Sequence, residues 1–241
     1  MSQEVYAKQF SIGEILTTAW KYFTENIQLV LGITLTISVP INLILAFFPL
    51  GDSLDSTSRY YQAVGILYGL LGIVATMAVA YAIARRVDGQ DVTVSDALKK
   101  AFSRWLPAIG SSILYGLFVV GLSLLLIVPG IIYGVFWMFT VYNVVLRDRA
   151  GKGALDESKR IIAGRWWTAF GYSLMLGLLT FLVAFLTSLP FSFLPDHSVV
   201  DFLASLSTAI LTSYFSVAMV IFFLNFDHTR QKEDTKPNEV E

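Results

Sequence analysis

The feature that most constrains this chain is a series of six apolar runs that contain no Asp, Glu, Lys, Arg or His. The runs cover residues 27–48, 64–84, 107–128, 130–146, 167–189 and 202–226. About 20 apolar residues are needed for a helix to cross a bilayer, where all backbone polar groups must bond internally. The runs therefore predict an all-α integral membrane bundle with six transmembrane helices. The composition agrees, because 55% of residues are hydrophobic and only 15% are charged, whereas soluble domains carry about 25% charged residues.

Three short segments with helical periodicity precede the first, third and fifth runs. Residues 11–23 place apolar side chains at steps of 3, 4, 7 and 8 from Ile12, and residues 93–105 repeat this spacing. Both begin with a capping-box pair, Ser11 with Glu14 and Thr93 with Asp96. The third segment, 150–162, lacks such a pair. These segments are too short and too charged to span, so the pattern predicts amphipathic helices in the plane of the membrane.

The three segments also align with one another. They share a leucine, which is followed three positions later by a small residue. The pairs are Leu16 with Ala19, Leu98 with Ala101, and Leu155 with Ser158. We interpret the chain as an internal repeat of in-plane helix and transmembrane hairpin, with units at about 11–84, 93–146 and 150–226. The units would form one transmembrane domain, residues 1–226. The charged segment 227–241 is predicted to be a mobile tail.

Basic residues fall almost entirely on one side of the predicted spans. All of the 17 Lys and Arg residues except Arg59 lie in the N-terminal segment, in the two connections that hold short segments, or in the tail. Such an excess of positive charge is typical of cytoplasmic loops. The distribution predicts a multi-pass protein of the cytoplasmic (inner) membrane with both termini in the cytoplasm. The three short helices would then lie on the cytoplasmic surface, where lipids are anionic.

The most basic segment, 147–171, joins the fourth and fifth spans. Seven of its residues form a candidate interface for lipid headgroups: Arg147, Arg149, Lys159, Arg160, Arg165, Trp166 and Trp167. Basic side chains attract anionic lipid, and tryptophans prefer the membrane–water interface. The same residues would also serve topology control and an aromatic belt without any specific ligand.

Polar and small residues inside the spans suggest further sites. Pro40 removes a backbone donor and should kink or break the first span beside Asn42. Asn42, together with Asn143 in the fourth span, is a candidate for substrate contact or for a hydrogen bond between helices. The glycine pairs expected to allow close helix packing are Gly65 with Gly69 and Gly130 with Gly134. Pro129 and Gly130 also predict the turn between the third and fourth spans.

The sequence gives little support for catalysis. It contains no cysteine and two histidines, and it has no metalloprotease, nucleotide-binding or hydrolase motif. Asp196, His197 and Asp201 form a conceivable metal cluster, although a solvated loop explains them as well. We expect no metal or cofactor. The net charge of −1 predicts no nucleic-acid partner.

Several of these elements together resemble a known family. They are the proline–glycine pair at 129–130, the Arg-Asp-Arg exit at 147–149, the segment 154–158, and the Gly-Arg-Trp-Trp motif at 164–167. With the opening segment, they resemble a broad prokaryotic group of six-span membrane proteins. The group includes YciC-like inner-membrane proteins and the membrane domain found beside glycerophosphodiester phosphodiesterases. The resemblance covers nearly the whole membrane part and implies a fold and a location. It carries over no phosphodiesterase residue, since the catalytic barrel has no counterpart in this sequence.

Three functional hypotheses follow from these patterns. The leading one is a non-enzymatic membrane protein that organises lipids or partner membrane proteins through its in-plane helices. The second is a transporter or channel for a neutral or amphipathic solute, with its site at the Pro40/Asn42 break. The third, a membrane enzyme acting on lipid, lacks the ionisable groups that such chemistry uses at depth.

Overall fold

A computed structural model describes residues 5, 8–47, 54–194 and 198–235. In this part of the chain all regular secondary structure is helical and no strand occurs, which confirms the predicted all-α fold. The helices are α2 (Ile12–Glu25), α3 (Ile27–Phe47), α4 (Leu54–Val87), α5 (Val94–Ser103), α6 (Trp105–Leu125), α7 (Ile127–Phe136), α8 (Thr140–Arg147), α9 (Lys152–Ile162), α10 (Trp166–Ser188), the 3-10 turn η1 (Phe191–Phe193) and α11 (Ser198–Thr235).

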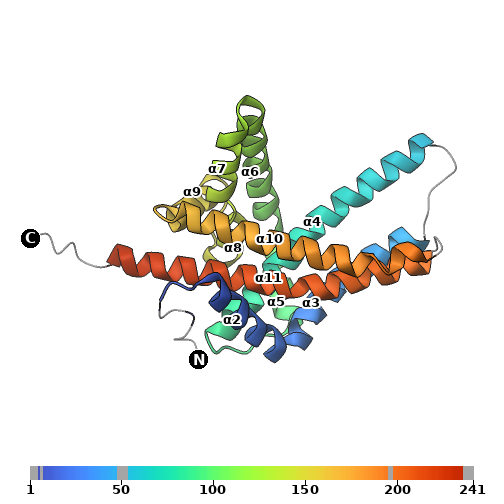
Figure 1. Ribbon diagram of the computed structural model, residues 1–241, viewed down its shortest axis with the longest axis horizontal. Coiled ribbons are helices and arrows are strands. Elements are labelled where there is room, and N and C mark those ends of the chain that lie inside the picture. The colour runs from blue at the N-terminus through green and yellow to red at the C-terminus, as the bar shows by residue number, and fades with distance from the viewer. Residues whose placement is uncertain (1–4, 6–7, 48–53, 195–197, 236–241) are drawn as a thin grey trace, which may run out of the picture.

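Six helical segments among the described residues are long and apolar enough to cross a membrane. They are Ile27–Ile44, Gln62–Val87, Trp105–Leu125, Ile127–Arg147, Trp166–Phe193 and Val199–Thr235. Helix α11 is central, because it packs against α2, α3, α4 and α10. Figure 1 shows α10 and α11 side by side, whereas the hairpin of α6 and α7 stands away from them. We call the end of the molecule where α2, α5 and α9 lie the short-helix end.

The two predicted capping boxes are present. The Ser11 hydroxyl accepts from the Glu14 N–H, and a Glu14 carboxylate oxygen accepts from the Ser11 N–H at 2.8 Å. Thr93 and Asp96 make the same reciprocal pair at the start of α5. The aligned small residues Ala19, Ala101 and Ser158 are each 0% exposed, so each short helix turns this position toward the core.

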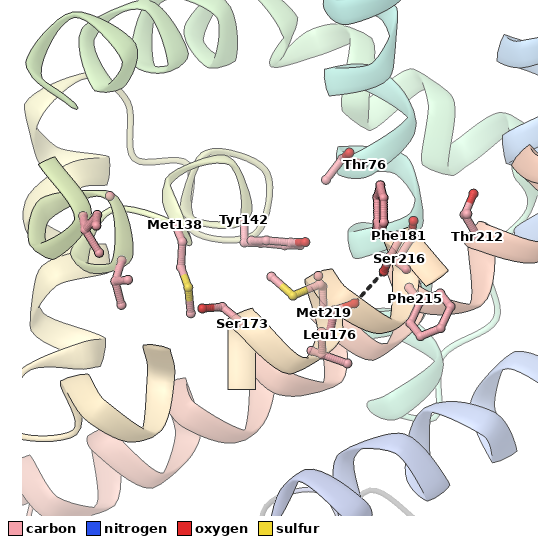
Figure 2. A pocket seen from close by; sticks show the side chains of 15 residues that line it. Thr76, Met138, Tyr142, Ser173, Leu176, Phe181, Thr212, Phe215, Ser216 and Met219 are labelled. Atoms are coloured by element: carbon pink, nitrogen blue, oxygen red, sulfur yellow. Dashed lines mark hydrogen bonds between the residues drawn. The ribbon is translucent and has the colours of Figure 1, made fainter. Parts of the chain in front are cut away.

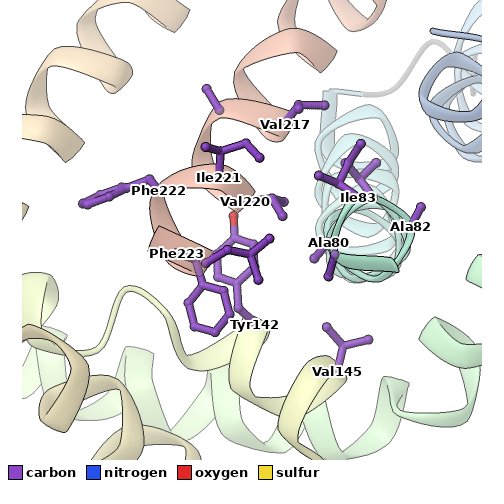
Figure 3. Close-up of a cluster of buried hydrophobic side chains, with 14 of the residues drawn as sticks. Ala80, Ala82, Ile83, Tyr142, Val145, Val217, Val220, Ile221, Phe222 and Phe223 are labelled. Carbon is purple, nitrogen blue, oxygen red and sulfur yellow. The ribbon is translucent and has the colours of Figure 1, made fainter. Parts of the chain in front are cut away.

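A cluster of aromatic and aliphatic side chains joins α4, α8 and α11 (Figure 3). Val217 and Val220 of α11 lie on the side toward α4, where Ala80 and Ile83 are fully buried. On the α8 side, the ring of Tyr142 stacks on Phe223 with centroids 5.3 Å apart. Offset aromatic pairs of this kind add about 0.5–1.5 kcal/mol beyond their area burial. This core holds α11 in place at the short-helix end.

The hairpin between the third and fourth spans turns earlier than predicted. Leu126 is extended, with φ −155° and ψ 127°, and α7 begins at the next residue. Pro129 and Gly130 therefore lie in the first turn of α7 rather than in the connection. Proline is tolerated there because the first N–H groups of a helix have no intrahelical partner.

The fourth span is not one continuous helix. Residues 137–139 separate α7 from α8, and Ser158 of α9 bridges the interruption. Its hydroxyl accepts from the Phe139 N–H at 3.1 Å and donates to the Phe136 carbonyl at 2.8 Å. The broken helix that we predicted at Pro40 thus occurs in another span, where a neighbouring side chain bonds the released backbone groups.

Helix α3 runs unbroken through Pro40, so the predicted break is wrong. One proline removes a single hydrogen bond, and the remaining i to i−4 bonds hold the helix together. Asn42 is 5% exposed and donates its side-chain amide to the Ser38 carbonyl at 2.8 Å, which turns its donor back onto its own helix.

The two glycine pairs behave differently. A Cβ atom added at Gly130 would lie 1.8 Å from the Ser123 hydroxyl, so α6 and α7 do approach closely there. At Gly134 the nearest atoms would be at 3.9 Å, an ordinary contact. Gly65 and Gly69 have nothing within 4 Å, and the predicted packing at this pair is therefore wrong within the chain. Both glycines are exposed in the part of the chain that the structure describes.

Two predicted boundaries also change. Helix α4 begins at Leu54, which lies before the predicted second apolar run, residues 64–84. Helix α11 extends to Thr235, so residues 227–235 are helical rather than part of a mobile tail. Both errors have the same cause. Polar residues next to an apolar run were taken as the boundary of the helix, whereas α4 begins before its apolar run and α11 continues beyond its own. Residues 236–241 lie outside the described residues.

Candidate functional site: an ion-pair network and an uncharged cavity

The basic segment forms an ion-pair network within the chain. Arg147, the last residue of α8, pairs with Glu157 of α9 and with Asp227 of α11. Arg160 bonds Glu157 at 2.7 Å and also pairs with Asp234. The network therefore ties three helices together at the short-helix end.

The acidic partners in this network are largely shielded. The side chain of Glu157 is 9% exposed and that of Asp227 is 11% exposed. Burial alone would raise the pKa of Glu157, but the hydrogen bond from Arg160 and the charges of Arg147, Arg160 and Arg149 outweigh it and lower that pKa. Removing one partner of a buried pair typically costs about 3–5 kcal/mol, because the other charge stays buried.

Arg165 and Trp166 are also bound within the chain. The Arg165 guanidinium donates to the Thr229 hydroxyl at 2.6 Å and to the Phe226 carbonyl at 2.9 Å, and it lies 4.6 Å from the Phe226 ring centroid. Desolvation is the main cause that lowers the pKa of Arg165. Trp166 donates its indole N–H to the Ile132 carbonyl at 3.0 Å.

The predicted headgroup interface is thus divided. Arg147, Arg160, Arg165 and Trp166 have partners in the protein, and their first role is to hold α8, α9, α10 and α11 together. Arg149 keeps 58% of its side chain exposed, although its Nε lies 3.8 Å from a Glu157 carboxylate oxygen, and Trp167 is 78% exposed. Lys159 is exposed as well, with its ammonium 5.7 Å from the Tyr133 ring centroid. Arg149, Lys159 and Trp167 are therefore the members that face outward.

The sequence reasoning did not identify the acidic partners. Asp227 directly follows the last apolar run, and its position was assigned to the tail. Glu157 was one acid among several in a basic segment. An acid three positions before an arginine on a predicted helix, as in Glu157 and Arg160, was the available signal. The distant pairing with α11 had no local signal.

Two asparagines connect elements rather than line a site. Asn143 is fully buried and donates to the Ala154 carbonyl at 3.3 Å, which links α8 to α9. Asn225 of α11 was not singled out from the sequence. Its amide donates to the Val5 and Lys8 carbonyls at 2.8 Å, and its side-chain oxygen accepts from the Phe10 N–H at 3.0 Å. Asn225 thereby fixes the N-terminal segment on α11.

A cavity of about 820 Å³ lies between α4, α7, α8, α10 and α11. It adjoins the break in the fourth span, since Val135, Met138 and Tyr142 line it. Its lining consists of apolar and hydroxyl-bearing residues, and no charged residue takes part. The full set is Thr76, Ile131, Gly134, Val135, Met138, Tyr142, Ser173, Leu176, Gly177, Thr180, Phe181, Thr212, Phe215, Ser216 and Met219. Figure 2 shows the labelled side chains gathered around this space.

Most lining hydroxyls donate to their own helix. Thr76 donates to the Gly72 carbonyl at 3.0 Å, Thr180 to Leu176 at 2.7 Å, and Thr212 to Thr208 at 2.7 Å. A hydroxyl that donates in this way still has lone pairs to accept hydrogen bonds. Thr76, Thr212 and Ser216 also line a smaller cavity of about 140 Å³, which reaches Ser38 and Ile41 on α3. Asn42 and Asn143 line neither cavity.

In the part of the chain that the structure describes, no group of three or more His, Cys, Asp or Glu side chains is placed to hold a metal ion. Two of the three residues in the conceivable outer cluster, Asp196 and His197, lie outside the described residues.

The fold defines a class: this is a multi-pass helical membrane protein. Its ion-pair network lies at the short-helix end, and a cavity with no charged lining residue lies between its long helices. Within that class, the chain belongs to the family of the domain of unknown function DUF7847, whose sequence model matches residues 102–227. The match begins in α5 and ends at Asp227, so it includes α8, α9 and α11 up to the buried carboxylate. No curated protein and no solved structure matches the chain.

Proposed function

We propose that this is a non-enzymatic protein of the cytoplasmic membrane that organises lipids, or partner proteins, at the cytoplasmic surface. In this proposal the three short amphipathic helices are repeated units in the membrane plane, and both termini are cytoplasmic. The observation that carries it is the arrangement of the short-helix end. Each short helix buries a small residue in the core, while basic and aromatic side chains remain exposed around the rim.

The exposed side chains suit an anionic lipid surface. Trp20 is 58% exposed, Phe102 48% and Trp167 78%, and tryptophan favours the interface of a membrane. Arg149 and Lys159 lie nearby on the segment that holds Trp167. A basic residue near an anionic surface contributes about 1 kcal/mol, which is roughly a fivefold change in binding. The proposed relation to YciC-like proteins and to the phosphodiesterase-associated membrane domain fits this role, because that resemblance implies a membrane location.

The experiment measures lipid enrichment around the purified protein in nanodiscs of mixed zwitterionic and anionic lipid. Native mass spectrometry would report the anionic fraction retained by the wild type and by the double variant Arg149→Gln, Lys159→Gln. We expect retention of anionic lipid to fall by roughly tenfold or more, since two charges are removed. The control is Arg59→Gln, at the basic position predicted for the opposite side. Equal anionic retention by the double variant and the wild type would contradict the proposal.

A second candidate function is transport of a neutral solute, and the cavity favours it. Discontinuous helices line the substrate sites of many transporters, and the break between α7 and α8 adjoins this cavity. The candidate site is therefore moved from Pro40 and Asn42 to the cavity wall. The cysteine-free chain allows a direct test with Gly177→Cys. Labelling by a small membrane-impermeant thiol reagent would mean an aqueous path and favour transport, and absence of labelling would argue against it.

A further inference from the structure

We infer that the cavity between α4, α7, α8, α10 and α11 binds an uncharged lipid, one with an apolar chain and an ester or hydroxyl oxygen that accepts a hydrogen bond from Tyr142. This inference rests on the membrane location in the proposed function. It goes beyond that function, because it concerns a site whose lining includes neither Arg149 nor Lys159.

The lining selects against charge. None of the residues around the cavity is Asp, Glu, Lys, Arg or His. Moving an unpaired charge into such surroundings costs several kcal/mol or more, whereas a neutral oxygen needs one hydrogen-bond partner. The basic side chains that would pair with a phosphate, such as Arg147 and Arg160, are bound to carboxylates in the ion-pair network. A phospholipid headgroup therefore finds no counter-charge in the cavity.

Tyr142 supplies the specific polar contact. Its side chain is 6% exposed, and Figure 2 shows its hydroxyl pointing into the cavity. This hydroxyl faces the cavity, so a ligand bound there can accept a hydrogen bond from it. Tyrosine hydroxyls in largely apolar surroundings usually have a hydrogen-bond partner. Because Thr180 and Thr212 donate to their own backbones, they offer lone pairs to a ligand hydroxyl, and Tyr142 offers its proton to a ligand oxygen.

The remaining wall suits an apolar chain. Leu176 and Phe215 are buried on one side, and Met138 and Met219 contribute flexible thioethers that adapt to irregular shapes. Phe181, which also lines the cavity, is 69% exposed and marks the mouth. Since Phe181 lies within a long apolar helix, this mouth opens toward the hydrocarbon of the bilayer. The volume of about 820 Å³ falls in the range of ligand sites, about 300–1,000 Å³.

The test uses the full chain in phosphatidylcholine nanodiscs and a photoactivatable diacylglycerol as the probe. Two variants change the site. Tyr142→Phe removes only the hydroxyl, and Gly177→Leu places a side chain in the cavity, where an added Cβ meets nothing within 4 Å. The matched controls are Tyr133→Phe, which lies outside the cavity lining, and Gly171→Leu, an equally open glycine on the same helix. Size-exclusion profiles verify that each variant remains folded.

We expect saturable labelling that unlabelled diacylglycerol displaces and that anionic phosphatidylglycerol displaces at least tenfold less well. Tyr142→Phe should weaken diacylglycerol binding about two- to tenfold, the worth of one hydrogen bond. Gly177→Leu should weaken it more than tenfold, and both controls should remain within twofold of the wild type.

Labelling that does not saturate, equal displacement by phosphatidylglycerol, or equal binding by the site variants and their controls would overturn the inference. The two proposals fail separately. Loss of anionic retention at the Arg149 and Lys159 rim is read without the photoprobe. Saturable labelling of the cavity is read in phosphatidylcholine nanodiscs before any phosphatidylglycerol is added as a competitor.

Discussion

Replacing Ser158 with alanine should destabilise the protein more than any other loss of a single hydroxyl at the short-helix end. Ser158 is 0% exposed and bridges the break in the fourth span. Its hydroxyl accepts from the Phe139 N–H at 3.1 Å and donates to the Phe136 carbonyl at 2.8 Å. The alanine variant leaves both backbone groups without this partner, although the side chain keeps nearly the same volume.

The magnitude follows from these two groups. A buried polar group that loses its partner costs about 1–3 kcal/mol, so two such groups predict a loss of roughly 2–6 kcal/mol in the free energy of unfolding. The matched control is Ser103→Ala, where an exposed hydroxyl donates only to the Lys100 carbonyl of its own helix. That change should stay within about 0.5 kcal/mol of the wild type.

Equilibrium unfolding by sodium dodecyl sulfate in mixed micelles would measure both variants. Hydrogen exchange at the Phe139 amide supplies an independent local readout, and this amide should exchange faster in Ser158→Ala. A loss below about 0.5 kcal/mol with unchanged exchange at Phe139 would refute the reasoning, because the break would then not depend on the hydroxyl.

Four further changes have defined outcomes. Gly130→Ala should force α6 and α7 apart and lower stability in the same unfolding assay, because the new Cβ would lie 1.8 Å from the Ser123 hydroxyl. Gly65→Ala, with open space around it, should be neutral or stabilise by up to about 1 kcal/mol. Asn225→Leu should release the N-terminal segment and raise hydrogen exchange at the Phe10 amide, which it binds at 3.0 Å; unchanged exchange there would contradict the assignment. The pKa of Glu157 is lowered in the folded state. Its ion pairs should therefore contribute fully to the free energy of unfolding above the ordinary glutamate pKa of about 4.3, and this contribution should be lost as the pH falls through the lowered pKa. In Glu157→Gln the free energy of unfolding should fall less steeply at acid pH than in the wild type. An unchanged pH dependence would contradict a stabilising role for the ion pairs of Glu157.

The helices could be predicted from the sequence because their causes are local. Uncharged runs of sufficient length specify spans, and Ser11 with Glu14 specifies the start of α2 through bonds that close within one turn. The ends of α4 and α11 could not be predicted in this way. Polar residues beyond Phe226 stay helical because they interact with other helices. Asp227, for example, forms an ion pair with Arg147 of α8.

The site depended on contacts between distant segments, and a single sequence carries no signal for these. Pro40 has the stronger local breaking signal, yet the break occurs at 137–139, where Ser158 from the next helix bonds the backbone. The cavity has no motif at all. Its hydroxyl groups come from four helices, and each of them alone resembles an ordinary polar residue of a membrane span. The basic segment was predicted to be an interface for lipid headgroups, but Arg147 and Arg160 pair with shielded carboxylates instead.

The extent of the family match has a physical reading in this structure. It ends at Asp227, the residue through which α11 reaches the Arg147 of α8 and, by way of Glu157, the helix α9. A segment that stopped before Asp227 would leave Arg147 with one carboxylate in place of two and would loosen α11 from α8. Since α8 and α11 both line the cavity, the ion pair between Arg147 and Asp227 also joins two of the helices that form its wall. The ion pairs and the proposed choice of ligand are thus connected. Because Arg147 and Arg160 are paired with carboxylates, neither of them is free to bind an anionic group in the cavity, and we expect the cavity to bind neutral ligands.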